Sequence, residues 1–172
     1  MNKQHLTCGK HWQNKEDGYL LLETLLAFMV AAVLLGFVVQ AVSSFSIGLQ
    51  AADEQIKLQE ARRHILAQLE KTLAYDATKI SLTDGNKINV VGLTGNKKIS
   101  IYNDKNALYQ RTTTGEGAGV NPLSLENVKV HSFLVQALDE RRLHICFTLS
   151  VHEREQKIEQ VIYCYNARVG DD

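Results

Sequence analysis

Proline is almost absent from this chain of 172 residues, in which Pro122 is the only one. Because proline kinks or breaks helices, its absence allows an uninterrupted helix over residues 19–74. Three cysteines are too few for a disulfide-dense scaffold. The 19 basic and 19 acidic residues give a formal net charge of zero. This balance does not indicate a nucleic-acid-binding surface, and we expect no direct DNA binding.

Motifs that would indicate an enzyme or a metal site are missing as well. His144 and His152 are 8 residues apart, about 26 Å along a strand at ~3.3 Å per residue, which is too far to share one ion. The segment Gly115–Gly119 lacks the lysine and the following helix of a phosphate loop, so a flexible surface loop is expected. No serine, histidine and acid trio has a recognisable motif. We therefore expect no catalytic activity, no cofactor and no metal.

The sequence does contain one long apolar run, residues 19–42, in which Glu23 is the only charged residue. As a helix, the 21 residues from Tyr19 to Val39 extend ~31 Å at ~1.5 Å per residue, about the hydrocarbon thickness of a bilayer. An unpaired carboxylate there costs on the order of 2.5–3.5 kcal/mol, so Glu23 needs a partner. Lysines precede the run and Asp53 and Glu54 follow it, which predicts a cytoplasmic N-terminus. A cleaved secretory signal, the alternative, has a shorter apolar core.

The order of residues around Gly18 resembles a known processing signal. Gly18, the aromatic Tyr19, three leucines and Glu23 precede the membrane-length helix, and this pattern is similar to the prepilin signal of type IV pilins and pseudopilins. The resemblance implies that a prepilin peptidase cleaves after Gly18 on the cytoplasmic side and methylates the new N-terminus, Tyr19. It also implies that Glu23 neutralises the α-amine of a neighbouring subunit, so that each charge is satisfied in the assembled filament. Glu16 and Asp17 stand where the family usually has basic residues.

The helical pattern continues beyond the apolar run. Apolar residues recur at spacings of three and four and therefore share one helix face: Leu58, Ala61, Ile65, Leu69 and Leu73. Charged residues lie between them, which predicts an amphipathic continuation of the same helix. The expected organisation is a leader peptide at 1–18, a transmembrane helix at 19–42, an amphipathic helix at 43–75 and an extracytoplasmic β-sheet domain at 76–172.

From Ile80 onward the apolar period changes to two, as in strands. Turn signals at 84–86, 94–96 and 103–106 divide the first part into a β-meander, and a glycine-rich loop at 112–121 follows. The predicted strands are 87–93, 97–102, 107–111, 128–136, 143–152 and 158–167. We expect one mostly antiparallel sheet that the amphipathic half of the helix covers, which makes the fold α+β.

Two cysteines lie in the last two predicted strands. With 153–157 as the hairpin loop, matching of the apolar faces places Cys146 opposite Cys164. A Cys146–Cys164 disulfide is feasible at a closely spaced pair of this kind, and two unrelated thiols are the alternative. Such a bridge would persist outside the cytoplasm. Cys8 lies in the predicted leader.

A long helix followed by a meander again resembles the pilin fold, and the strand and turn pattern after Ile99 is similar to minor pseudopilins such as ComGF-like competence subunits and the J-type subunit of type II secretion. The resemblance implies a minor structural subunit of a pseudopilus rooted in the cytoplasmic membrane, serving DNA uptake during competence. Its partners would be other pilin subunits and the prepilin peptidase. Type II secretion or a surface pilus is the alternative within this class. A single-pass membrane-anchored binding module or enzyme, which keeps residues 1–18, is the alternative of another class.

The arginine pairs Arg62-Arg63 and Arg141-Arg142 admit two interpretations. They could contact DNA, or they could lie on a solvated face or form intersubunit salt bridges with Asp53, Glu54 and Glu60. The second interpretation is favoured because the chain is neutral overall.

Overall fold

The computed structural model describes residues 10–170, with side chains from Tyr19 onward. Cys8 and the first half of the predicted leader therefore lie outside the described residues. The chain divides into two units, residues 1–50 and 51–172, and each unit is described separately below.

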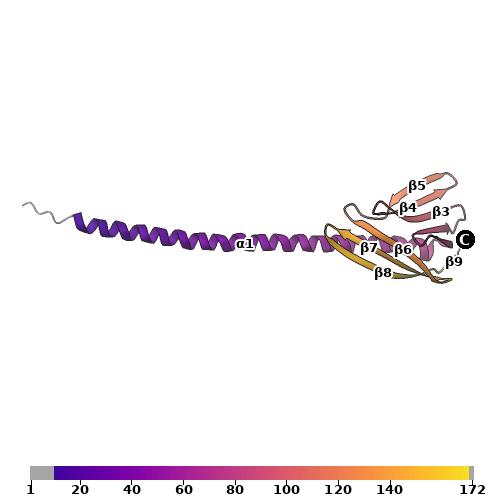
Figure 1. Cartoon of the computed structure of the whole chain (residues 1–172). Coiled ribbons are helices and arrows are strands. Elements are labelled where there is room, and N and C mark those ends of the chain that lie inside the picture. The colour runs from indigo at the N-terminus through magenta and orange to yellow at the C-terminus, as the bar shows by residue number, and fades with distance from the viewer. Residues whose placement is uncertain (1–9, 171–172) are drawn as a thin grey trace, which may run out of the picture. The chain divides into compact units, whose positions relative to one another are not determined.

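A single helix, α1 (Lys10–Glu70), passes through the predicted transmembrane and amphipathic segments without a break (Figure 1). It begins nine residues before Tyr19, where the apolar run starts. At its end the backbone widens into a π-helical turn, η1 (Lys71–Tyr75), in which the Asp76 amide donates to the Lys71 carbonyl at 3.1 Å. The uninterrupted course agrees with the absence of proline from this part of the chain.

Within residues 10–170, nine strands follow the helix and form two sheets. The strands are β1 (Ala77–Thr83), β2 (Lys87–Gly92), β3 (Lys98–Asp104), β4 (Ala107–Thr114), β5 (Gly117–Pro122), β6 (Lys129–Asp139), β7 (Arg142–Val151), β8 (Arg154–Tyr163) and β9 (Arg168–Gly170). The larger sheet has the order β5-β4-β3-β2-β1-β9 and the smaller one the order β6-β7-β8. All pairings are antiparallel except that of β1 with β9. The α+β class is confirmed, but the expectation of one sheet is wrong.

The hairpin turns explain where the strand boundaries differ from the predicted ones. Lys105 and Asn106 both have positive φ, 48° and 62°, and form the two-residue loop between β3 and β4, as a type I′ turn requires. His152 has φ 53° and with Glu153 forms the two-residue loop between β7 and β8. The predicted loop at 153–157 is therefore wrong, because β8 already begins at Arg154. The predicted loop at 112–121 is also wrong, because it forms the β4–β5 hairpin.

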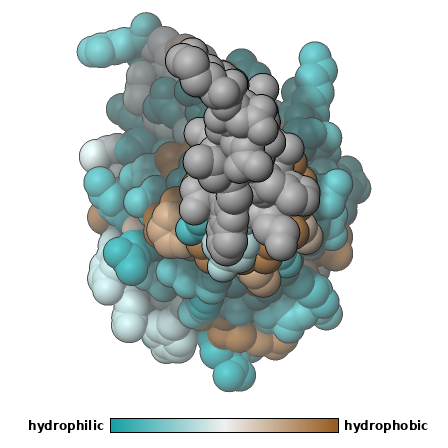
Figure 2. Space-filling model, turned by 90° about the vertical axis from the view of Figure 1, so that its left-hand side faces the viewer, coloured by the Kyte–Doolittle hydropathy of each residue, from teal (hydrophilic) through white to brown (hydrophobic). Residues whose placement is uncertain are grey.

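The core of the second unit joins the amphipathic face of the helix to the inner faces of both sheets. The five apolar residues predicted to share one helix face are all at most 5% exposed: Leu58, Ala61, Ile65, Leu69 and Leu73. Alternate residues of β7 are buried in the same core: Leu143, Ile145, Phe147 and Leu149. On the face shown in Figure 2, hydrophilic side chains cover most of the surface and apolar ones lie in small groups between them. The β-domain thus hides most of its large apolar side chains, which is the physical reason for its folding.

Candidate functional site: the exposed apolar helix and its C-terminal anchorage

The apolar part of α1 from Tyr19 to Leu49 leaves its large side chains exposed. Tyr19 is 72% exposed, Phe28 76% and Leu35 66%, and none of the most hydrophobic stretch is buried inside the structure. Among the described residues, this is the one helix that is long and apolar enough to cross a membrane. In water each such side chain forgoes ~1.5–3 kcal/mol of burial free energy. The segment therefore needs lipid or other protein to cover it.

Two polar side chains in this segment satisfy their hydroxyl groups within the helix. The Thr24 hydroxyl donates to the Leu21 carbonyl at 2.9 Å, and the Ser43 hydroxyl donates to the Val39 carbonyl at 2.9 Å. These bonds remove the cost of placing a hydroxyl group in lipid, where water is not present to bond it. The segment is thus compatible with a bilayer at both positions.

Glu23 differs from these hydroxyl residues. Its side chain is exposed, and among the side chains that the structure describes it has no ion-pair partner. Tyr19 lies four residues earlier, so the two side chains lie one turn apart on the same side of the helix. Beside them, Thr24, Ala27, Phe28 and Ala31 line a shallow hollow of about 280 Å³ on the helix surface. This end of the segment therefore presents one unpaired acid next to an apolar depression.

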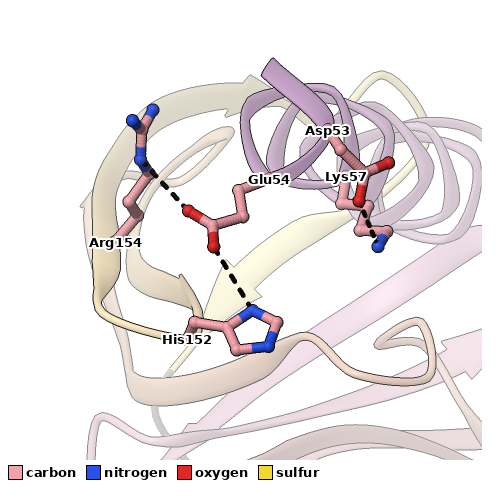
Figure 3. Close-up of polar contacts among 5 residues, drawn as sticks. All are labelled: Asp53, Glu54, Lys57, His152 and Arg154. Carbon is pink, nitrogen blue, oxygen red and sulfur yellow. Dashed lines mark hydrogen bonds and ion pairs between the residues drawn. The ribbon is translucent and has the colours of Figure 1, made fainter. Parts of the chain in front are cut away.

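In the second unit, a carboxylate on α1 fixes the β7–β8 hairpin (Figure 3). The side chain of Glu54 is 11% exposed, and its Oε2 lies 3.2 Å from Arg154 Nε while its Oε1 lies 3.5 Å from His152 Nδ1. The neighbouring Asp53 instead pairs with Lys57 one turn along the helix, at the surface. Sequence reasoning missed the contact of Glu54 because its partners lie about one hundred residues away in the chain. It had assigned Asp53 and Glu54 to intersubunit salt bridges with the arginine pairs.

Hydrogen bonds from later segments satisfy carbonyl groups that the end of the helix leaves free. The Tyr165 amide donates to the Ala74 carbonyl at 3.1 Å, and Asn166 Nδ2 donates to the Tyr75 carbonyl at 2.9 Å. The rings of Tyr75 and Tyr165 also stack, with centroids 5.6 Å apart. Together with the Glu54 contacts, these bonds hold the helix to the β-domain at both ends of their common core.

The predicted Cys146–Cys164 disulfide is not present, and the register explains why. Cys146 lies opposite Glu159, whereas the Cys164 amide donates to the Arg141 carbonyl at 2.8 Å. The two cysteines are therefore offset by five residues along the sheet, about 16 Å at ~3.3 Å per residue, whereas a disulfide needs Cα atoms within about 7 Å. Both thiols are free. The error came from the hairpin loop, which has two residues instead of five.

The remaining candidate features are a metal site and the two arginine pairs. Within the part of the chain that the structure describes, no three His, Cys, Asp or Glu side chains are placed to share a metal ion. Arg62 and Arg63 lie beside Gln156 at a hollow between α1 and β8. The Arg141 amide donates to Asp139 Oδ1 at 2.8 Å and lowers the pKa of Asp139, and the pairing of Arg142 with Asp139 at 2.6 Å lowers it further.

Comparison of the chain with protein-family models, with curated proteins and with solved structures finds no match. The features of this chain that bear on its function are therefore the exposed apolar helix, Glu23 and the residues around Gly18.

Proposed function

We propose that this chain is a minor pilin-like (pseudopilin) structural subunit, processed between Gly18 and Tyr19 and assembled through its N-terminal helix, with no catalytic activity. The observation that carries the proposal is the combination of a fully exposed, membrane-length apolar helix with a single acid near its start. The residues from Gly18 to Glu23 supply the resemblance to a prepilin signal.

The free energy of Glu23 favours assembly over a solitary anchor. An unpaired charge at the centre of a membrane helix costs ~2.5–3.5 kcal/mol, which is an upper bound for Glu23 near the start of the helix. Glu23 has no ion-pair partner among the described side chains. Cleavage after Gly18 would create an α-amine on Tyr19, and in a bundle of such helices the amine of one subunit neutralises the acid of the next. The charge then stabilises the assembled state and disfavours the isolated subunit.

The machine that this subunit serves is the second part of the proposal. We assign it to DNA uptake during competence, because the strand and turn pattern after Ile99 is similar to that of competence pseudopilins. Type II protein secretion or a surface pilus is the alternative within the same class. The subunit is placed in the cytoplasmic membrane, with its β-domain outside the cytoplasm.

Intact-mass measurement tests the processing step. The chain is co-expressed with a prepilin peptidase and extracted from the membrane, and we expect loss of residues 1–18 and one added methyl group on Tyr19. Gly18→Val should block cleavage. Gly36→Val is a matched control, because Gly36 lies in the same helix with no atom within 4 Å of an added Cβ. An uncleaved wild-type chain that is nevertheless functional would instead support a single-pass anchored module.

Assembly is tested separately with Glu23→Gln, which keeps the shape of the side chain and removes its charge. We expect processing to remain and co-purification with the other filament subunits to be lost. Glu116→Gln, at an exposed acid in the turn between β4 and β5, serves as the control and should co-purify normally. Normal co-assembly of the Glu23→Gln subunit would contradict the proposed role of this charge.

A further inference from the structure

The outer face of the six-stranded sheet collects basic side chains from the four consecutive strands β1–β4 and from β9, which is distant from them in sequence. In β1–β4 the residues on one face are buried, among them Ile80, Ile88, Ile99 and Leu108, so the alternate residues form the outer face. The register places these outer residues in three rows across the sheet. The rows are Thr83-Lys87-Tyr102-Tyr109-Pro122, then Gly170-Ser81-Asn89-Ser100-Arg111-Val120, and then Arg168-Lys79-Val91-Lys98-Thr113-Ala118.

These three rows, here named the basic sheet face, are unbalanced in charge. They contain five basic residues and no acidic one. The basic residues are Lys79, Lys87, Lys98, Arg111 and Arg168. Asp104 is one position beyond the first row, at the end of β3. A neutral chain thus has three rows of residues on one sheet face in which all the charge has one sign, and such a surface raises the local concentration of anions.

The centre of the basic sheet face is hollowed and carries aromatic rings. A hollow of about 420 Å³ is lined by Lys87, Lys98 and Arg111, with Ser100, Tyr102, Thr113, Asn86 and Asn103, and none of these residues is acidic. The rings of Tyr102 and Tyr109 are stacked, with centroids 5.9 Å apart and planes at 28°. Ser100 donates to Asn89 Oδ1 at 2.8 Å. Positive charge, tyrosine rings and short polar side chains therefore lie together on one surface.

We propose that the basic sheet face binds single-stranded nucleic acid. Lysines and arginines would contact the phosphates, and the tyrosine pair would stack on bases, which is the usual way in which proteins bind single strands without sequence preference. Neighbours within a row are ~4.8 Å apart and alternate residues along a strand are ~6.6 Å apart, so several basic side chains lie within reach of consecutive nucleotides. An acidic protein surface would also match the charge, but it would leave the paired tyrosines without a specific role.

This inference goes beyond the proposed assembly role, because it concerns a face of the β-domain and no residue of the apolar helix. It revises the expectation of no direct DNA binding, which was derived from the total charge. The choice of machine remains a separate question, and binding can be measured on the subunit before any filament is formed.

The test uses the full chain in nanodiscs of phosphatidylcholine, a zwitterionic lipid, with a fluorescent twenty-nucleotide oligo(dT) as the probe. Fluorescence anisotropy is measured over a range of salt concentrations. If all five basic residues contact phosphates, the logarithm of the binding constant falls by about 3.5 per tenfold rise in salt, so doubling the salt weakens binding about tenfold. Absence of binding at a protein concentration of about 10⁻⁴ M in low salt would overturn the proposal.

Charge reversal locates the binding to this face. The variant Lys87→Glu/Lys98→Glu/Arg111→Glu should bind oligo(dT) at least tenfold more weakly than the wild type. The matched control Arg62→Glu/Arg63→Glu/Lys71→Glu changes the net charge by the same amount on α1 and η1, and it should bind at least tenfold more tightly than the first variant. Equal weakening by both variants would show a non-specific charge effect and would overturn the proposal.

The tyrosines distinguish nucleic acid from an acidic protein partner. Tyr102→Ala should weaken binding of oligo(dT) at least fivefold, and Tyr102→Phe, which keeps the ring, should bind as the wild type does. Thermal unfolding of both variants shows whether the fold is retained. Tighter binding of a labelled poly-glutamate peptide than of oligo(dT), or an unchanged affinity for oligo(dT) in a folded Tyr102→Ala variant, would refute the assignment to nucleic acid.

Discussion

Two isoleucines on α1 give a direct test of which face of the helix packs against the sheets. Ile65 is completely buried, whereas Ile56, nine residues earlier, is 56% exposed. Truncation of a buried isoleucine to alanine removes its burial energy and leaves a cavity, at a cost of about 2–5 kcal/mol. Because Ile65 lies in the middle of the buried stripe between Leu58 and Leu73, we expect a cost for Ile65→Ala of about 3–4 kcal/mol.

The same substitution at Ile56 should have almost no effect. Substitutions at exposed positions usually change the free energy of unfolding by less than about 0.5 kcal/mol, and alanine is a better helix former than isoleucine. At roughly 4 °C per kcal/mol for a domain of this size, Ile65→Ala should lower the melting temperature by about 12–16 °C and Ile56→Ala by less than 2 °C. Thermal unfolding followed by circular dichroism in detergent measures both shifts. Similar shifts in the two variants would show that the helix face is assigned incorrectly.

Four further predictions concern the contacts around the β7–β8 hairpin. Burial and the charge of Asp139 raise the pKa of Cys164 from 9.0 to about 11. In a Cys8→Ser chain, which keeps only Cys146 and Cys164, alkylation at pH 8 should therefore label the half-buried Cys146 and leave Cys164 unlabelled. As the pH rises, the Cys164 thiol loses its proton in the unfolded chain before it does so in the folded chain. The free energy of unfolding should therefore fall between pH 9 and 11 by up to about 1.4 kcal/mol per pH unit. The same pH dependence in a Cys164→Ala chain would contradict this prediction. Glu54→Gln should lower the free energy of unfolding by about 1 kcal/mol, and by less at high salt. The effect is small because the side chains of Arg154 and His152 remain 46% and 66% exposed and hydrated. Asp53→Asn, which breaks an ion pair at the surface, is the control and should lower it by less. Cys146 lies opposite Leu134 on β6 and opposite Glu159 on β8, and one of these two pairs is of the closely spaced, non-hydrogen-bonded kind. Oxidation should therefore form a disulfide with Cys146 in either the Leu134→Cys or the Glu159→Cys variant. Failure of both variants to form the disulfide would refute the register.

The helix was predictable from local patterns, and the sheets were predictable only in part. The stripe from Leu58 to Leu73 and the lack of proline determine one amphipathic helix, because both signals act within a few residues of the chain. The turns at Gly85 and Gly95 were also recognisable, since both glycines have positive φ. The turn at His152 was not, because histidine at positive φ is an uncommon choice. A wrong loop there shifted the register and brought two cysteines together that the structure separates.

The division of the strands into two sheets has a different cause. Apolar alternation shows which residues of a strand face the core, and it holds for β7 and for β2. It carries no information on which strand is the neighbour, so β6 could be placed beside β4 or apart from it. In the structure β6 pairs with β7, and two hydrogen bonds connect it to the turns of the other sheet, from the Val130 amide to Asn106 and from the Val135 amide to Gly85.

The same reasoning explains why total charge is a poor guide to the surfaces of this protein. Net charge is a sum over all residues, whereas a ligand meets the residues that pairing places on one face. The acids of this chain are used elsewhere: Glu54 holds the hairpin and Asp139 pairs with Arg142. The basic residues of β1 to β4 lie on four consecutive strands and share one face because the register of these strands aligns them. An experiment that measures salt-dependent binding by one face therefore tests the register of the sheet as well as its charge.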